Sequence, residues 1–119
     1  MKICMIGTGY VGLVSGTCFA DIGHQVYCVD KDLSKINQLN SGISPIYEPG
    51  LDELIKKNHK AKRLYFTSDL KKAITISDII FICVGTPNIK GSLKVDLSFV
   101  FKCTKEIIAI TKKKKIIVT

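Results

Sequence analysis

The chain has 119 residues, of which 46% are hydrophobic, and its formal net charge is +8 at pH 7. This length and composition are typical of one globular domain with its own core, and they exclude a disordered chain. No apolar run approaches the ~20 residues that cross a bilayer. The first predicted strand begins at Lys2, which leaves no room for a signal peptide. We therefore expect a cytoplasmic protein without a membrane partner.

Lysines supply almost all of the positive charge and are spread along the chain, with Arg63 as the only arginine. A basic balance can indicate binding to nucleic acid. However, the sequence has no nucleic-acid recognition motif and no interleaving of arginine with aromatic residues. The run from Lys112 to Lys115 is interpreted as a solvated helix end before an apolar strand. We expect no nucleic-acid partner, and salt-dependent binding to generic DNA would overturn this expectation.

The cysteines are odd in number and form no Cys-x-x-Cys pair. We interpret them as buried free thiols that act as small hydrophobic side chains, and we expect neither a metal site nor a disulfide framework. The five positions are Cys4, Cys18, Cys28, Cys83 and Cys103.

The first thirty residues predict a nucleotide site. Lys2–Ile6 has the length and apolar character of a buried strand, and a glycine pattern, Gly7 to Gly12, follows it directly. A helix is predicted over Leu13–Ile22 and a second strand over Gln25–Val29, which ends on the acid Asp30. The order of strand, glycine turn, helix, strand and acid is the one that dinucleotide binding requires.

Each glycine of this pattern has a predicted role. Gly7 allows a sharp turn after the strand, Gly9 lets a pyrophosphate approach the main chain, and Gly12 lets the helix pack closely on the strand. Asp30 is placed to accept hydrogen bonds from an adenosine ribose. Its carboxylate would repel a 2′-phosphate, so we expect NAD rather than NADP, although the neighbouring Lys31 could accommodate such a phosphate.

A short helix capped by Asp32 or Ser34 is predicted to run to about Leu39. Lys35 projects from its first turn, near the expected adenosine end of a cofactor. From spacing alone, a solvated lysine and a cofactor-binding lysine are equally good interpretations.

A proline- and glycine-containing loop follows, and then a helix is predicted over Leu51–Lys57. Its first turn carries two acidic residues, which favour a helix N-terminus. The charged segment 58–63 is interpreted as a turn in which His59 is exposed, before a short strand at Leu64–Phe66.

The rest of the chain repeats the alternation of helix and strand. A helix is predicted over Leu70–Ile74, a strand buried on both faces over Ile79–Val84, and a helix over Leu97–Thr111. Thr86, just beyond the fourth strand, is expected to face the cofactor. The last strand, Lys115–Thr119, runs to the final residue, so we expect the chain to continue in a longer protein.

Five strands that alternate with helices predict an α/β fold with a doubly wound parallel sheet of the Rossmann type. Right-handed crossovers then predict the strand order 3-2-1-4-5, with helices on both faces. One domain, residues 1–119, is expected.

Several stretches resemble the N-terminal NAD-binding domain of the UDP-glucose/GDP-mannose dehydrogenase family, and the resemblance covers essentially the whole chain. The matching stretches are Gly7 to Leu13, Val29-Asp30, Lys35-Ile36, Pro45 to Leu51 and Val84 to Pro87. The Pro-Ile-Tyr-Glu-Pro-Gly-Leu stretch is the most specific. It is more similar to the UDP-glucose enzymes than to the GDP-mannose or UDP-N-acetylmannosamine enzymes, which stay open as alternatives.

The resemblance implies oxidation of the C6 alcohol of UDP-glucose to a carboxylate with two NAD+ per turnover, in a protein that forms homo-oligomers. It also implies NAD-site roles for four residues: Val11, Asp30, Lys35 and Thr86. With the glycine turn included, the predicted cofactor-binding set is Gly7, Gly9, Tyr10, Val11, Gly12, Asp30, Lys35 and Thr86.

The catalytic cysteine of the family and its lysine, asparagine and aspartate helpers belong to a linker helix and a C-terminal UDP-sugar domain. No cysteine here matches the catalytic one, so we predict no catalytic residue in this chain. We expect it to bind NAD without turning over substrate. Two other interpretations are a 6-phosphogluconate or hydroxyacyl-CoA type of dehydrogenase, against which the Tyr10-Val11 pair argues, and a stand-alone NAD-binding module.

Overall fold

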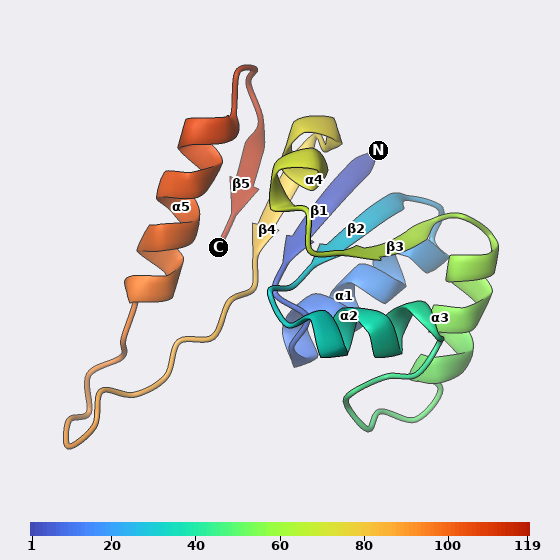
Figure 1. Ribbon diagram of the computed structural model, residues 1–119, viewed down its shortest axis with the longest axis horizontal. Helices are drawn as coiled ribbons and strands as arrows, with labels where there is room; N and C mark the ends of the chain where they lie inside the picture. The colour runs from blue at the N-terminus through green and yellow to red at the C-terminus, as the bar shows by residue number, and fades with distance from the viewer.

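Five parallel strands form a single sheet, as Figure 1 shows for the computed structural model, which describes residues 1–119. The strands are β1 (Lys2–Ile6), β2 (Gln25–Val29), β3 (Leu64–Thr67), β4 (Ile79–Ile82) and β5 (Ile116–Val118). Their spatial order is β3-β2-β1-β4-β5, and every neighbouring pair is parallel. The predicted fold class and strand order are therefore confirmed.

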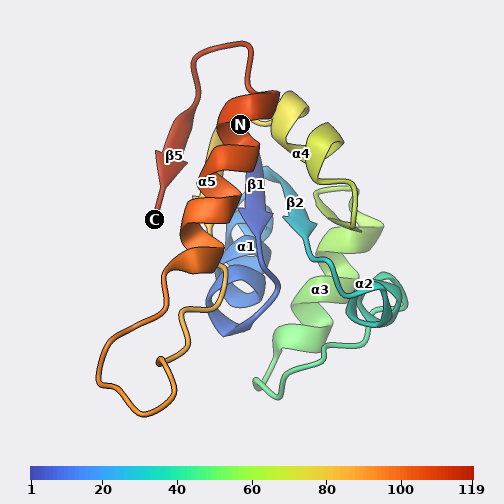
Figure 2. The same cartoon turned by 60° about the vertical axis from the view of Figure 1, so that its left-hand side comes forward.

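Helices connect the strands and cover both faces of the sheet, as predicted. They are α1 (Tyr10–Asp21), α2 (Leu33–Asn40), α3 (Leu51–Lys60), α4 (Leu70–Ile76) and α5 (Ser98–Ile110). Figure 2 shows α5 in front of the sheet and α1 behind it. None of these helices has both the length and the apolar character that a membrane span needs.

Each face of the sheet has its own core. Ile3 and Met5 of β1 belong to a cluster of 12 buried residues that includes side chains of α1, α2 and α3. Cys4 and Ile6 of the same strand point the other way, into a cluster of 9 buried residues with α4 and α5. Because β1 is covered on both sides, its sequence is an unbroken apolar run, as is usual for central parallel strands.

Helix α1 begins earlier than predicted, at Tyr10 instead of Leu13. Gly9 is its N-cap residue, with φ −76° and ψ −170°, and the Leu13 N–H donates to the Gly9 carbonyl at 2.9 Å. The glycine pattern and the helix therefore overlap, so that the last glycine of the pattern lies inside the first turn of the helix.

Helix α3 is longer than predicted and ends at Lys60 instead of near Lys57. The prediction that His59 lies exposed in a turn is wrong. Its side chain is half-buried, its Nδ1 atom lies 3.1 Å from the Leu64 carbonyl, and its ring stacks on Phe66 with 6.1 Å between centroids. The neighbouring lysines, which gave the segment its turn-like character, lie on the exposed side of the helix.

All cysteines are free thiols, and Cys4, Cys28 and Cys103 are buried as predicted. Burial raises the pKa of Cys4 to about 12, so this thiol stays protonated at neutral pH. Cys83 is half-buried directly after β4. The prediction of burial is wrong for Cys18, because its side chain lies on the side of α1 that faces solvent.

The lysine run before β5 is only partly solvated. Lys112 to Lys114 are exposed, but the Lys115 ammonium donates to the carbonyl of Thr75 at 3.1 Å and also to that of Ser77. These carbonyls lie at the C-terminal end of α4, where a cation is favourable. Lys115 therefore ties the segment before β5 to α4.

Candidate functional site

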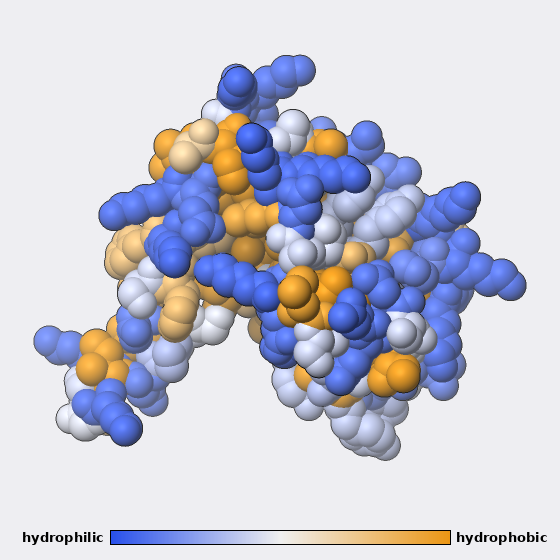
Figure 3. Space-filling view, viewed as in Figure 1, coloured by the Kyte–Doolittle hydropathy of each residue, from blue (hydrophilic) through white to orange (hydrophobic).

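A cleft of about 1010 Å³ opens at the carboxyl ends of β1, β2 and β4. This is where open parallel sheets bind ligands, at the point where the strand order reverses. Seven of the eight predicted cofactor-site residues line it: Gly7, Gly9, Tyr10, Val11, Asp30, Lys35 and Thr86. Figure 3 shows a hollow with apolar surface (orange) between α5 and the rest of the molecule, bordered by hydrophilic side chains (blue).

The glycine turn is locked by close approach of the main chain. Gly7 has φ +106°, and a Cβ atom at this position would lie 2.5 Å from the Cys83 carbonyl oxygen. A Cβ atom on Gly12 would lie 1.9 Å from the Gly7 carbonyl oxygen. Gly12 is buried and does not line the cleft. The close packing predicted for Gly12 is with the turn after β1 and with Cys83, and its effect on any ligand is through the shape of this turn.

The N-terminus of α1 presents free hydrogen-bond donors to the cleft. No backbone acceptor is present for the N–H groups of Tyr10 and Val11, and Gly9 has no side chain to cap them. A Cβ atom on Gly9 would meet no atom within 4 Å, so the space beside the turn is open. Free N–H groups and the positive end of the helix dipole favour an anionic ligand here.

The Asp30 carboxylate is held from two sides. Its Oδ2 atom accepts hydrogen bonds from the Thr8 hydroxyl (2.6 Å) and the Thr8 N–H (3.0 Å), and its Oδ1 atom accepts one from the Asp32 N–H (3.0 Å). Burial raises the pKa of Asp30, but these hydrogen bonds and the nearby Lys35 ammonium outweigh it, so that the pKa lies below its ordinary value of 3.8. The carboxylate is therefore ionised and fixed, with 17% of the side chain exposed.

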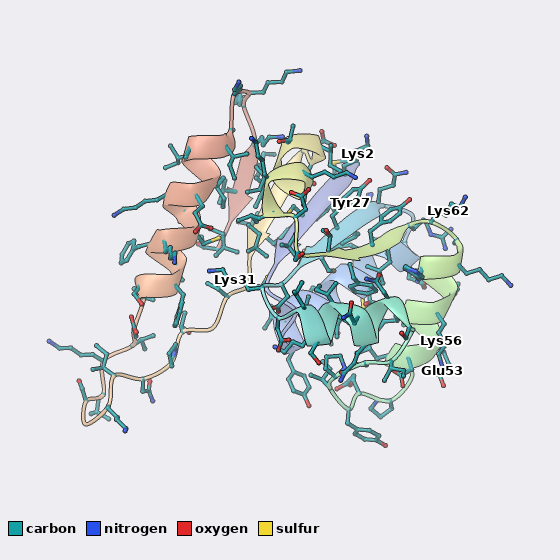
Figure 4. The ribbon with its side chains drawn as sticks, in the orientation of Figure 1. Lys2, Tyr27, Lys31, Glu53, Lys56 and Lys62 are labelled. Carbon is teal, nitrogen blue, oxygen red and sulfur yellow. The ribbon has the colours of Figure 1, made fainter.

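Lys35 borders this carboxylate, and Lys31 lines the same cleft. Asp32 caps α2 by accepting hydrogen bonds from the N–H groups of Ser34 (2.9 Å) and Lys35 (3.2 Å), which fixes the first turn of the helix. The Lys35 ammonium lies 4.0 Å from the Asp30 Oδ2 atom. Lys31 extends from the end of β2 toward α5 and also lines the cleft (Figure 4). The cleft thus combines a fixed carboxylate with three cationic groups, because Lys102 of α5 also lines it.

The remaining predicted residues lie on the outer walls. Tyr10 and Val11 are exposed on the first turn of α1, and the Tyr10 hydroxyl lies 3.4 Å from the Tyr47 carbonyl in the loop before α3. Thr86 is exposed in the segment after β4. The structure therefore brings residues from three separate parts of the chain to one cleft.

Thr8 and one face of α5 also belong to this site, although they were not predicted from the sequence. Thr8 is buried at the wall of the cleft and its hydroxyl donates to Asp30. Phe99, Lys102, Cys103 and Glu106 line the cleft from α5. Their spacing of three, four and seven residues is that of one helix face, so this signal was available in the sequence. Thr8 gave no such signal, because a threonine in a turn is ordinary turn chemistry.

The whole chain, residues 1–119, matches the family described as UDP-glucose/GDP-mannose dehydrogenase family, NAD binding domain. It is 58% identical over 109 residues to a UDP-glucose 6-dehydrogenase of Rhizobium meliloti (strain 1021), an alignment that covers 92% of this chain and 25% of the relative. It is 57% identical over 106 residues to UDP-glucose 6-dehydrogenase TuaD of Bacillus subtilis (strain 168), which covers 89% of this chain and 23% of the relative.

A similar fold is found in the crystal structure of a ternary complex of GDP-mannose dehydrogenase from Pseudomonas aeruginosa. The TM-score is 0.90 and the identity is 43%, over 97% of this chain and 26% of that one. The chain therefore spans about a quarter of the length of the relatives it matches.

Proposed function

Because this chain belongs to the UDP-glucose/GDP-mannose dehydrogenase family and matches its NAD-binding domain, we propose that NAD+ binds in the cleft at the carboxyl ends of β1, β2 and β4. The observation that carries this proposal is the Asp30 carboxylate, held ionised beside an open glycine turn. The residues proposed to contact or shape the site are Gly7, Gly9, Tyr10, Val11, Gly12, Asp30, Lys35 and Thr86.

The glycine turn fits a pyrophosphate. The free N–H groups at the start of α1 can donate to phosphate oxygens, and the open side of Gly9 lets those oxygens approach the main chain. The cleft also carries Lys31 and Lys35, whose charges offset those of a diphosphate. The pyrophosphate of a cofactor would therefore find hydrogen-bond donors and positive charge on the same side of the cleft.

Asp30 fits an adenosine ribose. A carboxylate offers about four lone-pair positions, and Thr8 and Asp32 together supply three hydrogen bonds. The remaining position is on Oδ1 and can accept a ribose hydroxyl, while the Lys35 ammonium can donate to a neighbouring one. A 2′-phosphate would meet an ionised carboxylate instead, which favours NAD+ over NADP+.

In the complete protein we propose that this domain serves a UDP-glucose 6-dehydrogenase. NAD+ would supply the hydride acceptor: two hydride transfers to two NAD+, with the addition of one water and the loss of three protons, convert the C6 alcohol of UDP-glucose to the carboxylate of UDP-glucuronate. The two UDP-glucose 6-dehydrogenases at 58% and 57% identity support this substrate. The catalytic residues would come from the part of the protein beyond this domain, in a homo-oligomer. The free cysteines support a reducing compartment such as the cytoplasm.

A related sugar nucleotide is the second candidate. The structural match to GDP-mannose dehydrogenase, with a TM-score of 0.90, favours it. The fold of this domain is shared by enzymes that act on either substrate, so the fold alone does not distinguish UDP-glucose from GDP-mannose. NADH formation by the complete protein with UDP-glucose and with GDP-mannose would distinguish them. A stand-alone NAD-binding module would form NADH with neither.

Calorimetric titration of the 119-residue chain with NAD+ and NADP+ tests the cofactor site. We expect NAD+ to bind at least about tenfold more tightly than NADP+, and Asp30→Ala to weaken NAD+ binding by about tenfold, because a hydrogen bond to a charged group is lost. Asp21→Ala is the matched control, since Asp21 lies at the far end of α1 and outside the cleft. Absence of NAD+ binding by the folded chain would overturn the proposal.

A further inference from the structure

Thr8 is a buried polar residue whose hydroxyl bonds only to the acid of the proposed cofactor site. Its side chain is 1% exposed, and its Oγ1 atom lies 2.6 Å from Asp30 Oδ2. Buried hydroxyl groups need a partner, and a charged acceptor gives a shorter and stronger hydrogen bond than a neutral one. The backbone N–H of Thr8 donates to the same oxygen at 3.0 Å, so one residue supplies both donors.

Strand pairing brings these two residues together. Ile6 of β1 lies opposite Val29 of β2, and the Gly7 N–H donates to the Val29 carbonyl at 2.8 Å. Thr8 lies two residues after Ile6 and Asp30 directly after Val29, so the two residues meet at the carboxyl ends of β1 and β2. The contact is therefore part of the rigid junction between the glycine turn and β2.

The surroundings of Asp30 are basic. Lys35 from α2, Lys31 after β2 and Lys102 from α5 line the same cleft, and Glu106 is the only other carboxylate on its wall. Three ammonium groups would attract a 2′-phosphate as readily as a pyrophosphate. The net charge of the cleft therefore does not exclude NADP+. Exclusion of the 2′-phosphate of NADP+ depends instead on the position of the Asp30 carboxylate.

We propose that Thr8 is a positioning residue that sets the preference of this site for NAD+ over NADP+ by fixing the Asp30 carboxylate. The inference rests on the proposed NAD+ site. With both donors of Thr8 on Oδ2 and the Asp32 N–H on Oδ1, both carboxylate oxygens are held in place, and the Lys35 ammonium lies 4.0 Å from Oδ2. The carboxylate stays where the acid of this fold meets the 2′ position of the ribose. Without the Thr8 hydroxyl it can turn, and the repulsion of a 2′-phosphate weakens.

The test compares dissociation constants of NAD+ and NADP+ for variants of the whole chain. Thr8→Val removes the hydroxyl with little change of shape, and Thr8→Ser keeps it. Thr17→Val is the matched control, because Thr17 is also buried but donates to the Leu13 carbonyl at 2.8 Å, inside α1. We expect the preference for NAD+ to fall about fivefold in Thr8→Val and to change by less than about twofold in Thr8→Ser and Thr17→Val.

A second readout needs no nucleotide. Carbon NMR of the Asp30 carboxyl against pH should give a higher pKa in Thr8→Val than in the wild type, and an unchanged one in Thr8→Ser, because only the hydroxyl bond is removed. Thr8→Ala provides a second hydroxyl-free variant if Thr8→Val does not fold. An unchanged preference in a hydroxyl-free variant that still binds NAD+ would overturn the role of Thr8 alone. A wild-type chain that binds neither nucleotide would overturn the proposed site itself.

Discussion

Gly9 and Gly12, two glycines of the same pattern, differ in how much space surrounds them. The position of a Cβ atom on Gly12 is already occupied, since it lies 1.9 Å from the Gly7 carbonyl oxygen. The corresponding position at Gly9 is empty to 4 Å and faces the cleft. Protein packing therefore requires a glycine at position 12, whereas at position 9 only a ligand would require one.

Alanine substitutions separate these two requirements. We expect Gly12→Ala to lower the free energy of unfolding by about 2 kcal/mol or more, because the backbone must move to admit the methyl group. We expect Gly9→Ala to change it by less than about 1 kcal/mol, the cost of alanine at an N-cap. Urea denaturation measures both effects.

The binding measurement gives the second half of this test. Gly9→Ala should weaken NAD+ binding by at least about tenfold in calorimetry, since its methyl group would stand where a phosphate must approach. A folded Gly9→Ala chain that binds NAD+ like the wild type would show that the open space beside the turn is not the phosphate site.

At the scale of the elements, Asn58 joins three parts of the chain. Its amide nitrogen donates to Asp21 Oδ1 at 3.0 Å and to the Leu54 carbonyl at 2.9 Å, and its Oδ1 atom accepts from Arg63 Nη2 at 2.9 Å. The side chain is fully buried. The ends of α1 and α3 and the start of β3 are therefore held by one amide.

We expect Asn58→Ala to destabilise the chain by about 2 kcal/mol, because the fully buried amide and its hydrogen bonds to Leu54, Asp21 and Arg63 are lost. Asn37→Ala is the control, since Asn37 is exposed on α2 and should change stability by less than about 0.5 kcal/mol. Urea denaturation of both variants gives the comparison. Equal effects in the two would mean that the amide network adds nothing to stability.

Asn58 and its neighbour His59 show how much of the fold can be predicted from the sequence. The strands and their order follow from apolar runs separated by helices, and they were predicted correctly. The end of α3 was not, because Asn58 and His59 look like turn residues, and their burial (full for Asn58, partial for His59) comes from contacts with α1 and β3. In the cleft, the glycine turn, Asp30 and Thr86 follow from local patterns. The Thr8–Asp30 bond depends on strand register, which a local pattern does not contain.

At the scale of the whole molecule, the sheet has one open and apolar edge. β5 pairs with β4 alone, and the side chains of Ile116 and Ile117 are 59% and 42% exposed. Figure 1 shows β5 at the end of the sheet. Nearby, α5 buries only Cys103 and Ile107 and leaves Phe101 and Ile108 exposed. An edge strand with free backbone groups and apolar side chains is a template for pairing with another chain.

We therefore expect the isolated chain to self-associate through β5 as its concentration rises, because pairing of two such edges satisfies free backbone groups and covers apolar surface. Sedimentation measurements over a concentration series would show a rising average mass. Ile116→Lys should restore a monomer by placing a charge on the edge. Ile22→Lys, which changes a still more exposed apolar residue (72%) at the C-cap of α1, should leave the association unchanged. Association that persists in Ile116→Lys would place the contact elsewhere on the surface. A wild-type chain that stays monomeric at every concentration would show that the three residues of β5 are too short an edge to pair.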